Sequence, residues 1–284
     1  MESGALAKEA PEDRALLGCV TVLVASGELP RAFKEFNGTE YRVGQIPLPK
    51  HWDEPTEFVF ARLMFPGGPL DGYQATGRFT GDYHFGLSLW TQDYPRADRH
   101  FLEAVRRLSR LDARPVEQIV DLEDGDDIFN WPWIYAVQAG EWGLTERQSK
   151  ILKEYLDRGG FFLADDIHGV AEWEQFVERV GYGQPDRPVV DIPNSDAIFH
   201  TVFDLDDRYI INGRDHLREG SKNGGTVAYW RAIYDEKGRI VVAAAYNSDL
   251  GDAWEWADDP GYPEKMSGLA IRLGINYIVY AMTH

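Results

Sequence analysis

The stretch GGFFLADDIHGVAEWEQF, residues 159–176, decides the fold of this chain. Residues 161–164 are continuously apolar and follow two glycines, which is typical of a strand covered on both faces. After a short polar turn, Val170, Trp173 and Phe176 recur at helical spacing. A buried strand that passes directly into an amphipathic helix is the repeating unit of a parallel α/β sheet.

The same alternation extends on both sides of this unit. Apolar runs predict further strands at residues 58–65, 133–137, 227–234 and 240–246. Helical spacing of apolar residues predicts helices at residues 97–108, 145–156 and 266–280. Thr145 and Gln148 have the spacing of a capping box, and a short turn with Gly238 joins the last two strands. The sequence therefore predicts a doubly wound α/β fold, with a mainly parallel sheet, helices on both faces and a C-terminal antiparallel hairpin.

The chain has 284 residues, of which 44% are hydrophobic, enough for one large core. Residues 28–56 contain four prolines and little periodicity, which predicts an extended lead-in. We therefore expect the folded domain to span residues 57–284.

Residues 15–27, ALLGCVTVLVASG, follow Arg14 and have the length of the apolar part of an export signal. They are too short to span a bilayer. Residues 1–27 are expected to be an export signal or anchor, which predicts a periplasmic or membrane-anchored protein that meets the membrane only through this segment. The acidic residues before Arg14 favour the alternative, a buried strand with a charged leader and a cytoplasmic protein.

The net charge of −18 is spread along the chain, which argues against binding to nucleic acid or to anionic lipid. Cys19 is the single cysteine, so an intramolecular disulfide and a cysteine-ligated zinc site are excluded. No phosphate-binding glycine loop stands at a predicted strand-to-helix junction, so no nucleotide cofactor is expected. A neutral, cationic or metal-bridged partner fits this composition.

In open α/β sheets, ligands bind outside the carboxyl ends of the strands. Asp165, Asp166 and His168 follow the strand at 161–164. They are candidate catalytic residues, because carboxylates and an imidazole can hold a divalent cation or divide into a base and its orienting partner. The alternative is structural: an aspartate caps the following helix and the histidine bonds locally.

A second polar group follows the last predicted strand. The candidate ligand-binding residues in it are Asn247, Asp249, Asp252, Trp254 and Glu255. The ligand spacing of an EF-hand calcium loop is not satisfied. Tryptophan among carboxylates suits stacking on a sugar ring, and the alternative is an aromatic lid packed on the core.

Further candidates lie near the first predicted helix and in the first predicted strand. Asp93 and Tyr94 stand directly before the helix at 97–108, where Asp93 could cap the helix and Tyr94 could contact a ligand. Arg62 interrupts the apolar run at 58–65 and must find a partner, for which we expect an anionic group of the ligand.

Several stretches resemble a bacterial family known as domain of unknown function 4159. They are WTQDYPRADRHF (90–101), WPWIYAVQAG (131–140), residues 159–176, YNSDLGDAWEWADDPGYP (246–263) and LGINYIVYAMTH (273–284). The resemblance implies a flavodoxin-like fold related to class I glutamine amidotransferases and trehalose-utilisation-like proteins, and export or membrane anchoring. It implies no activity. Because it places His284 in a closing motif, we expect this residue to reach the site.

An amidotransferase needs a cysteine nucleophile after a central strand, with a distant histidine partner. Asp165 and Asp166 occupy that place here, and Cys19 lies outside the expected domain. Hydrolysis of glutamine by a cysteine nucleophile is therefore not expected.

Three functions follow from these observations. The first is a cell-envelope domain that binds a small polar ligand or a protein partner in an amidotransferase-like cleft. The second is a hydrolase acting on a carbohydrate or related polar substrate, in which the 165–168 group supplies acid, base or metal ligands and the 247–255 group orients the substrate. The third is a structural subunit of a membrane-associated complex. The hydrolase requires residues 165–172 and 247–255 to share one cleft.

Overall fold

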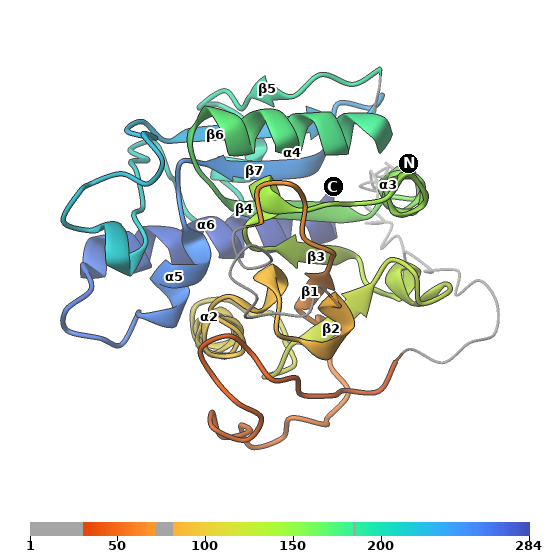
Figure 1. Ribbon diagram of the computed structural model, residues 1–284. Coiled ribbons are helices and arrows are strands. Elements are labelled where there is room, and N and C mark those ends of the chain that lie inside the picture. The colour runs from red at the N-terminus through yellow and green to blue at the C-terminus, as the bar shows by residue number, and fades with distance from the viewer. Residues whose placement is uncertain (1–30, 72–81, 184–185) are drawn as a thin grey trace, which may run out of the picture.

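The computed structural model describes residues 31–71, 82–183 and 186–284. Its seven-stranded sheet has the order β2-β1-β3-β4-β7-β6-β5 (Figure 1). The strands are β1 (Ala61–Met64), β2 (Gln118–Asp121), β3 (Trp133–Ala136), β4 (Phe161–Ile167), β5 (Val190–Asp191), β6 (Tyr229–Tyr234) and β7 (Ile240–Tyr246). The first five in the sheet order are parallel, while β6 and β5 continue the sheet antiparallel. Counted along the chain, the parallel strands β2-β1-β3-β4-β7 have the flavodoxin-like order 2-1-3-4-5, in which β7 is the fifth parallel strand. The predicted fold is therefore confirmed.

Helices cover both faces of the sheet. They are α2 (Arg96–Leu108), α3 (Glu146–Asp157), α4 (Gly169–Gly183), α5 (Leu250–Glu255) and α6 (Glu264–Thr283). Successive strand residues alternate between two cores, as the pleat requires. Phe161 and Leu163 pack with α2, α5 and α6, whereas Phe162 and Ala164 pack with α3 and α4.

Local signals set several element ends. Helix α3 begins with the predicted capping box, in which the Gln148 amide donates to Thr145 Oγ1 at 3.2 Å and the Thr145 amide donates to Gln148 Oε1 at 2.9 Å. Strand β4 is longer than the predicted 161–164 and runs through Ile167, with an irregularity between Ala164 and Ile167 in its pairing with β7. This irregularity lies where the polar residues of the site begin.

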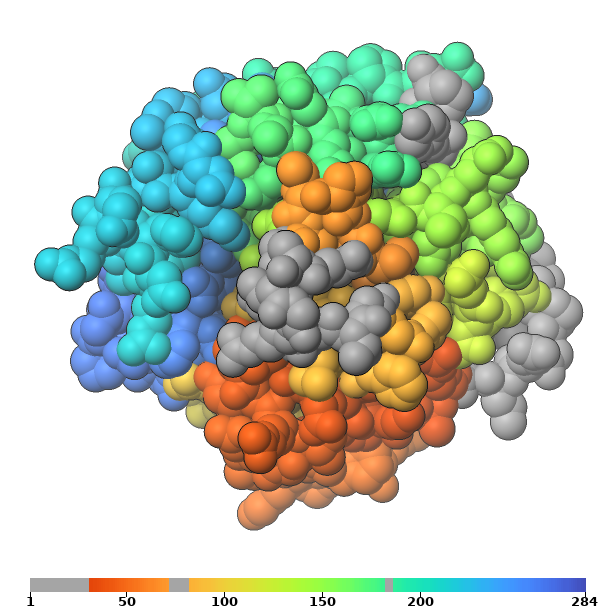
Figure 2. Space-filling model, viewed as in Figure 1, coloured from red at the N-terminus to blue at the C-terminus, as the bar shows by residue number. Residues whose placement is uncertain are grey.

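Residues 31–56 of the lead-in contain turns but no helix or strand. In the space-filling view they form the red-to-orange band along the lower side of the molecule (Figure 2). Phe36 meets Trp90 edge-on with ring centroids 5.5 Å apart, and Glu35 pairs with Arg99 at 2.8 Å. The segment thus packs on the α/β domain.

The predicted export segment, residues 1–27, lies outside the described residues. Within the described ranges, no helix combines the length and the apolar character that crossing a bilayer demands.

Candidate functional site

The segments that follow β4 and β7 meet at the carboxyl edge of the parallel strands. Asp165 is completely buried and accepts hydrogen bonds from the amides of Leu250 and Gly251, at 2.9 and 2.8 Å from its Oδ2. The Tyr135 hydroxyl donates to the same oxygen at 2.9 Å. Burial and the charge of Asp166 raise the pKa of Asp165 to about 7, against these hydrogen bonds. Asp165 therefore ties α5 to the end of β4.

Asp166 lies at the centre of a buried ionic group. Its carboxylate receives Lys222 Nζ at 2.9 and 3.1 Å, and its Oδ1 lies 2.8 Å from His168 Nε2. Burial opposes the charge on Asp166, but Lys222 and His168 outweigh it and hold the pKa of Asp166 well below its usual range. Asp166 is therefore a fixed negative charge.

His168 has only 1% of its surface exposed. Despite the contact with Asp166, neither of its ring nitrogens makes a well-directed hydrogen bond within the described residues. A buried polar atom nearly always has a partner, and leaving it without one costs about 1–3 kcal/mol. Nδ1 is thus a buried polar atom without a protein partner among the described residues, which singles out His168 as a candidate to bind a water molecule or a ligand.

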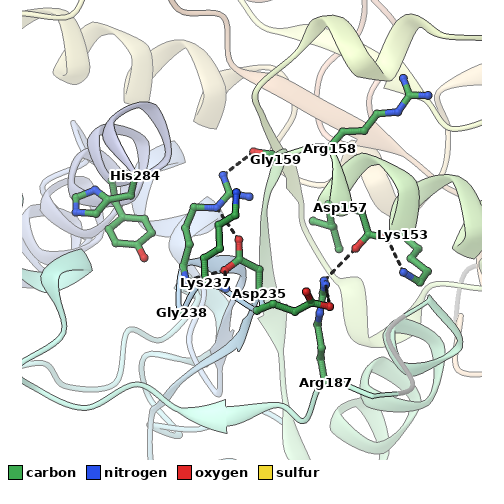
Figure 3. Close-up of a pocket in the computed structure, with 13 residues that line it drawn as sticks. Lys153, Asp157, Arg158, Gly159, Arg187, Asp235, Lys237, Gly238 and His284 are labelled. Atoms are coloured by element: carbon green, nitrogen blue, oxygen red, sulfur yellow. Dashed lines mark hydrogen bonds and ion pairs between the residues drawn. The ribbon is translucent and has the colours of Figure 1, made fainter. Parts of the chain in front are cut away.

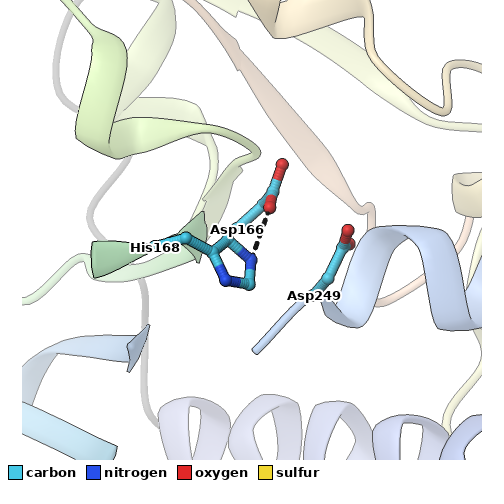
Figure 4. A group of neighbouring side chains, drawn as sticks. All are labelled: Asp166, His168 and Asp249. Carbon is cyan, nitrogen blue, oxygen red and sulfur yellow. Dashed lines mark ion pairs between the residues drawn. The ribbon is translucent and has the colours of Figure 1, made fainter. Parts of the chain in front are cut away.

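Asp249 completes the first carboxylate group. One ligand atom from each of Asp166, His168 and Asp249 lies within 4.8 Å of the others, and Figure 4 shows Asp166 above the imidazole and Asp249 to its right. Burial, followed by the charges of Asp166 and Asp252, raises the pKa of Asp249 well above its usual range. The pKa values of these two neighbouring carboxyl groups are thus shifted in opposite directions.

A second carboxylate group lies next to the first. One oxygen each from Asp93, Asp252 and Glu255 lies within 4.8 Å of the others. Glu40 of the lead-in joins them, because its Oε2 accepts from the Asp93 amide at 3.2 Å. Burial is the main cause that raises the pKa of Asp93, and it raises that of Glu255 to about 8.

Unusual backbone conformations gather at this edge. Among the described residues, six other than glycine have a positive φ, and five of them lie around the site: Asp93, Gln138, Asp166, Asn223 and Asn247. Their φ angles lie between 48° and 61°, in the left-handed region. Such conformations are frequent at functional sites, so their clustering makes the carboxyl edge the candidate site.

Four predicted ligand residues have structural roles instead. The donors of Arg62 all go to Asp98 and to the carbonyl oxygens of Trp90 and Gln92, so Arg62 does not await an anionic ligand. Trp254 has no exposed surface and stacks on Phe101 with ring centroids 4.2 Å apart. The alternative interpretation of Trp254, a packed aromatic lid, is the one that its burial supports.

Tyr94 also has no exposed surface, and its hydroxyl accepts from the Phe36 amide at 3.2 Å. Asn247 uses both ends of its amide within the protein: Oδ1 accepts from Gly169 at 3.0 Å and Nδ2 donates to Val227 at 2.8 Å. Both residues brace the loops around the site. Neither presents a free polar atom to a ligand.

His284 lies at the opposite edge, where the parallel strands begin. It lines a pocket of about 720 Å³ together with the C-terminal end of α3 and the turn between β6 and β7 (Figure 3). Its ring stacks on Tyr280 with centroids 4.4 Å apart. His284 therefore lies apart from the predicted residues that meet at the carboxyl edge, because α6 ends at the amino edge.

Sequence reasoning missed Lys222 and Glu40, and it gave Asp93 a different role. Lys222 and Glu40 come from loops without periodicity, so no pattern indicated their place. Asp93 does not cap α2, whose N-cap residue is Pro95 without a side-chain hydrogen bond. The position of Asp93 directly before a predicted helix indicated a helix cap, and nothing in the sequence indicated that its side chain joins Asp252 and Glu255.

The profile of the family described as "Domain of unknown function (DUF4159)" matches residues 83–282. No curated protein matches the chain. The matched region contains β2 to β7, α2 to α6 and both carboxylate groups except Glu40.

Proposed function

Because the chain belongs to the DUF4159 family, whose function is unknown, we propose a function from its geometry: a hydrolase that acts on a carbohydrate or a related polar substrate. The observation that carries the proposal is the group formed by His168, Asp166 and Asp249 at the carboxyl edge. Two neighbouring carboxyl groups with pKa values shifted in opposite directions are the arrangement that acid–base catalysis needs.

His168 is the proposed general base. Nδ1 takes a proton from a water molecule while the water oxygen attacks the electrophilic carbon of the substrate. The ionised Asp166, 2.8 Å from Nε2, stabilises the imidazolium that forms. Lys222 keeps Asp166 ionised throughout, so this proton stays on the imidazole.

Asp249 is the proposed general acid. In its protonated form it donates a proton to the leaving oxygen as the bond to carbon breaks. The proton on His168 then returns through solvent to Asp249, which restores both groups. One water molecule is consumed: its hydroxyl group joins the electrophilic carbon, and a proton joins the leaving oxygen.

The charge of the site favours a neutral or cationic substrate. The net charge of −18 and the carboxylates at this edge repel anions. Hydroxyl groups of a sugar donate hydrogen bonds readily to carboxylate oxygens. Asp165 is assigned to positioning rather than to acid–base catalysis, because all its hydrogen bonds lie within the protein.

A second candidate is a binding domain without catalysis. The burial of the site favours it: Asp166 has 3% and Asp249 has 6% of its surface exposed. In this case the same edge would hold a small polar ligand or an envelope protein partner without turning it over.

We also propose the relation to amidotransferases and the export of the protein. The order of the parallel strands, β2-β1-β3-β4-β7, supports the relation to amidotransferases. The apolar run at 15–27 supports export. Detection of the protein in a periplasmic or membrane fraction, with its N-terminus sequenced, tests the second proposal.

The hydrolase is tested with 4-nitrophenyl glycosides and acetyl esters, comparing the wild type with His168→Gln and Asp249→Asn. His200→Gln is the matched control, since His200 pairs with Asp204 away from the site. Loss of a general acid or base lowers the rate about 10²- to 10⁴-fold, so both site variants should lose activity while the control keeps it. If no substrate is turned over faster by the wild type than by His168→Gln, the binding domain replaces the hydrolase.

A further inference from the structure

The second carboxylate group, formed by Asp93, Asp252 and Glu255, has a chemistry of its own. Asp252 and Glu255 come from α5 and Asp93 from the loop before α2, so three carboxylates from two parts of the chain converge. Asp93 has 9% and Glu255 has 2% of its surface exposed. Carboxylates this close and this buried repel one another unless protons or a bound cation neutralise them.

The cationic side chains around this group are engaged elsewhere. Arg62 gives its guanidinium to Asp98 and to backbone carbonyls. Arg96 pairs with Asp258 at 2.7 Å and donates to Tyr41. Arg214 lies over the Trp256 ring, with its central carbon 3.7 Å from the ring centroid. Within the described residues, no side chain therefore forms an ion pair with the three carboxylates.

Glu255 supplies a second and independent sign of a ligand. Its Oε1 is buried and has no hydrogen-bond partner within the described residues. A buried carboxylate oxygen without a partner is costly, because its lost hydration is not replaced. The Tyr41 hydroxyl and the Asp252 carboxyl group interact with the Glu255 carboxyl group, but they leave Oε1 without a hydrogen bond among the described residues.

The backbone holds the carboxylates together. A Cβ atom on Gly213 would lie 2.7 Å from the Oδ2 atoms of both Asp249 and Asp252. A Cβ atom on Gly251 would lie 2.5 Å from Asp93 Oδ2. A side chain at either position would have to displace these carboxylates, so glycine permits their close approach to the main chain.

We propose that Asp93, Asp252 and Glu255 bind one hard divalent cation, of the Ca²⁺ or Mg²⁺ class, with Glu40 at the rim. Both ions prefer oxygen ligands, at about 2.3–2.6 Å for Ca²⁺ and about 2.0–2.1 Å for Mg²⁺. Oxygens within 4.8 Å of one another can share such an ion. The absence of nitrogen and sulfur from this group disfavours Zn²⁺ and Cu²⁺.

This site is separate from the acid–base group of the proposed hydrolase. Its ligands are not His168, Asp166 or Asp249, and cation binding is measured without any substrate. Failure of cation binding would therefore leave the hydrolase proposal standing, and failure of hydrolysis would leave the cation site standing.

The test uses the full chain after chelation, titrated with Ca²⁺, Mg²⁺, Mn²⁺ or Zn²⁺ by calorimetry and by thermal melting. A cation that binds only the folded state raises the melting temperature. We expect one Ca²⁺ or Mg²⁺ per chain. Tb³⁺, a luminescent probe for Ca²⁺ sites, should be sensitised by Trp256, whose Nε1 lies 2.9 Å from Asp252 Oδ1.

The variants Glu255→Gln and Asp93→Asn should fold, since a neutral amide removes repulsion in the group. Each should weaken cation affinity at least about tenfold, because even loss of an outer partner of a metal ligand has an effect of this size. Glu103→Gln, an exposed glutamate of α2 paired with Arg107, is the matched control and should bind as the wild type does. Should one variant fail to fold, Tb³⁺ emission of the other and of the wild type decides.

Two results would overturn the proposal. One is a wild-type protein that neither melts higher with Ca²⁺, Mg²⁺ or Mn²⁺ nor sensitises Tb³⁺. The other is stabilisation by Zn²⁺ alone that survives Glu255→Gln, which would place the cation on the nitrogen-containing group with His168.

Discussion

Both edges of the sheet are rich in charged side chains, but acids and bases are paired at the amino edge, whereas acids predominate at the carboxyl edge. At the amino edge, Asp157 meets Lys153 and Arg187, and Asp235 meets Arg239, so acids and bases form pairs around the pocket (Figure 3). At the carboxyl edge, several buried carboxylates lie together, among them Asp166 and Asp249 (Figure 4). Among the described residues, Lys222 is the one lysine or arginine that forms an ion pair with this group.

This difference indicates which charged residues form ordinary ion pairs and which are candidates for a function. Exposed ion pairs are worth little and are easily replaced. A buried excess of one sign lowers stability, and folded proteins retain it where protons, cations or substrates are bound. This contrast supports our proposal that the carboxyl edge carries the function, although a pocket of about 720 Å³ lies at the amino edge.

The largest expected effect follows from Asp166→Asn. The change leaves Lys222 buried without its counter-ion, and breaking a buried pair in this way costs about 3–5 kcal/mol. Urea denaturation should show this loss in the free energy of unfolding. A loss below about 1 kcal/mol would mean that the charge of Lys222 reaches solvent and that the group is not truly buried.

Rising pH should destabilise the chelated protein. The pKa of Asp165 is about 7 when folded and 3.8 in its ordinary state, so between these values the folded state binds more protons. Its contribution is complete below about pH 4 and is lost as the pH rises through 7. The raised pKa values of Asp93, Asp249, Asp252 and Glu255 act in the same direction.

We expect the free energy of unfolding to fall by about 3 kcal/mol between pH 5 and pH 8.5, measured in urea with chelator present. Asp166, with its lowered pKa, is ionised throughout this window and adds no slope. A flat or rising profile would contradict the burial of the carboxylates. Saturating Ca²⁺ should reduce the slope if the cation site exists.

Glu255→Gln should stabilise the chelated protein at pH 8.5 by about 2 kcal/mol, because it removes one charge from the repelling group. Thermal melting of the wild type and the variant measures this directly. Destabilisation by the variant would indicate that Glu255 has an attractive partner in solution.

The smallest effect belongs to the amino edge. Asp157→Asn breaks the contacts with Lys153 and Arg187, yet the side chain of Asp157 is 37% exposed. The expected loss is at most about 0.5 kcal/mol in the same urea experiment. A loss as large as that for Asp166→Asn would remove the contrast between the two edges.

The fold was predictable where burial leaves a continuous pattern. The apolar strands β3, β4 and β7 and the helices α2, α3, α4 and α6 were all indicated by the sequence. Strand β2 was missed because Gln118 and Asp121 bound its short apolar centre, and α5 because six residues give too few turns for periodicity.

The site was predictable only in part, because only some of its residues follow a strand that the sequence pattern indicates. Asp166, His168 and Asp249 follow strands, and the topology brings strand ends together. Lys222 and Glu40 reach the same edge from irregular loops, where contacts depend on tertiary packing and not on any local pattern. Arg62 was expected to meet a ligand, because nothing in the sequence reveals that Asp98 turns toward it.

The most direct test of the central claim compares one histidine from each edge. His168 lies in the buried carboxyl-edge group, and His284 lines the pocket at the amino edge. With a substrate that the wild type hydrolyses, we expect His168→Gln to lower kcat at least about 100-fold and His284→Gln to leave it unchanged. Equal activity of His168→Gln and the wild type, or loss of activity in His284→Gln alone, would contradict the assignment of function to the carboxyl edge.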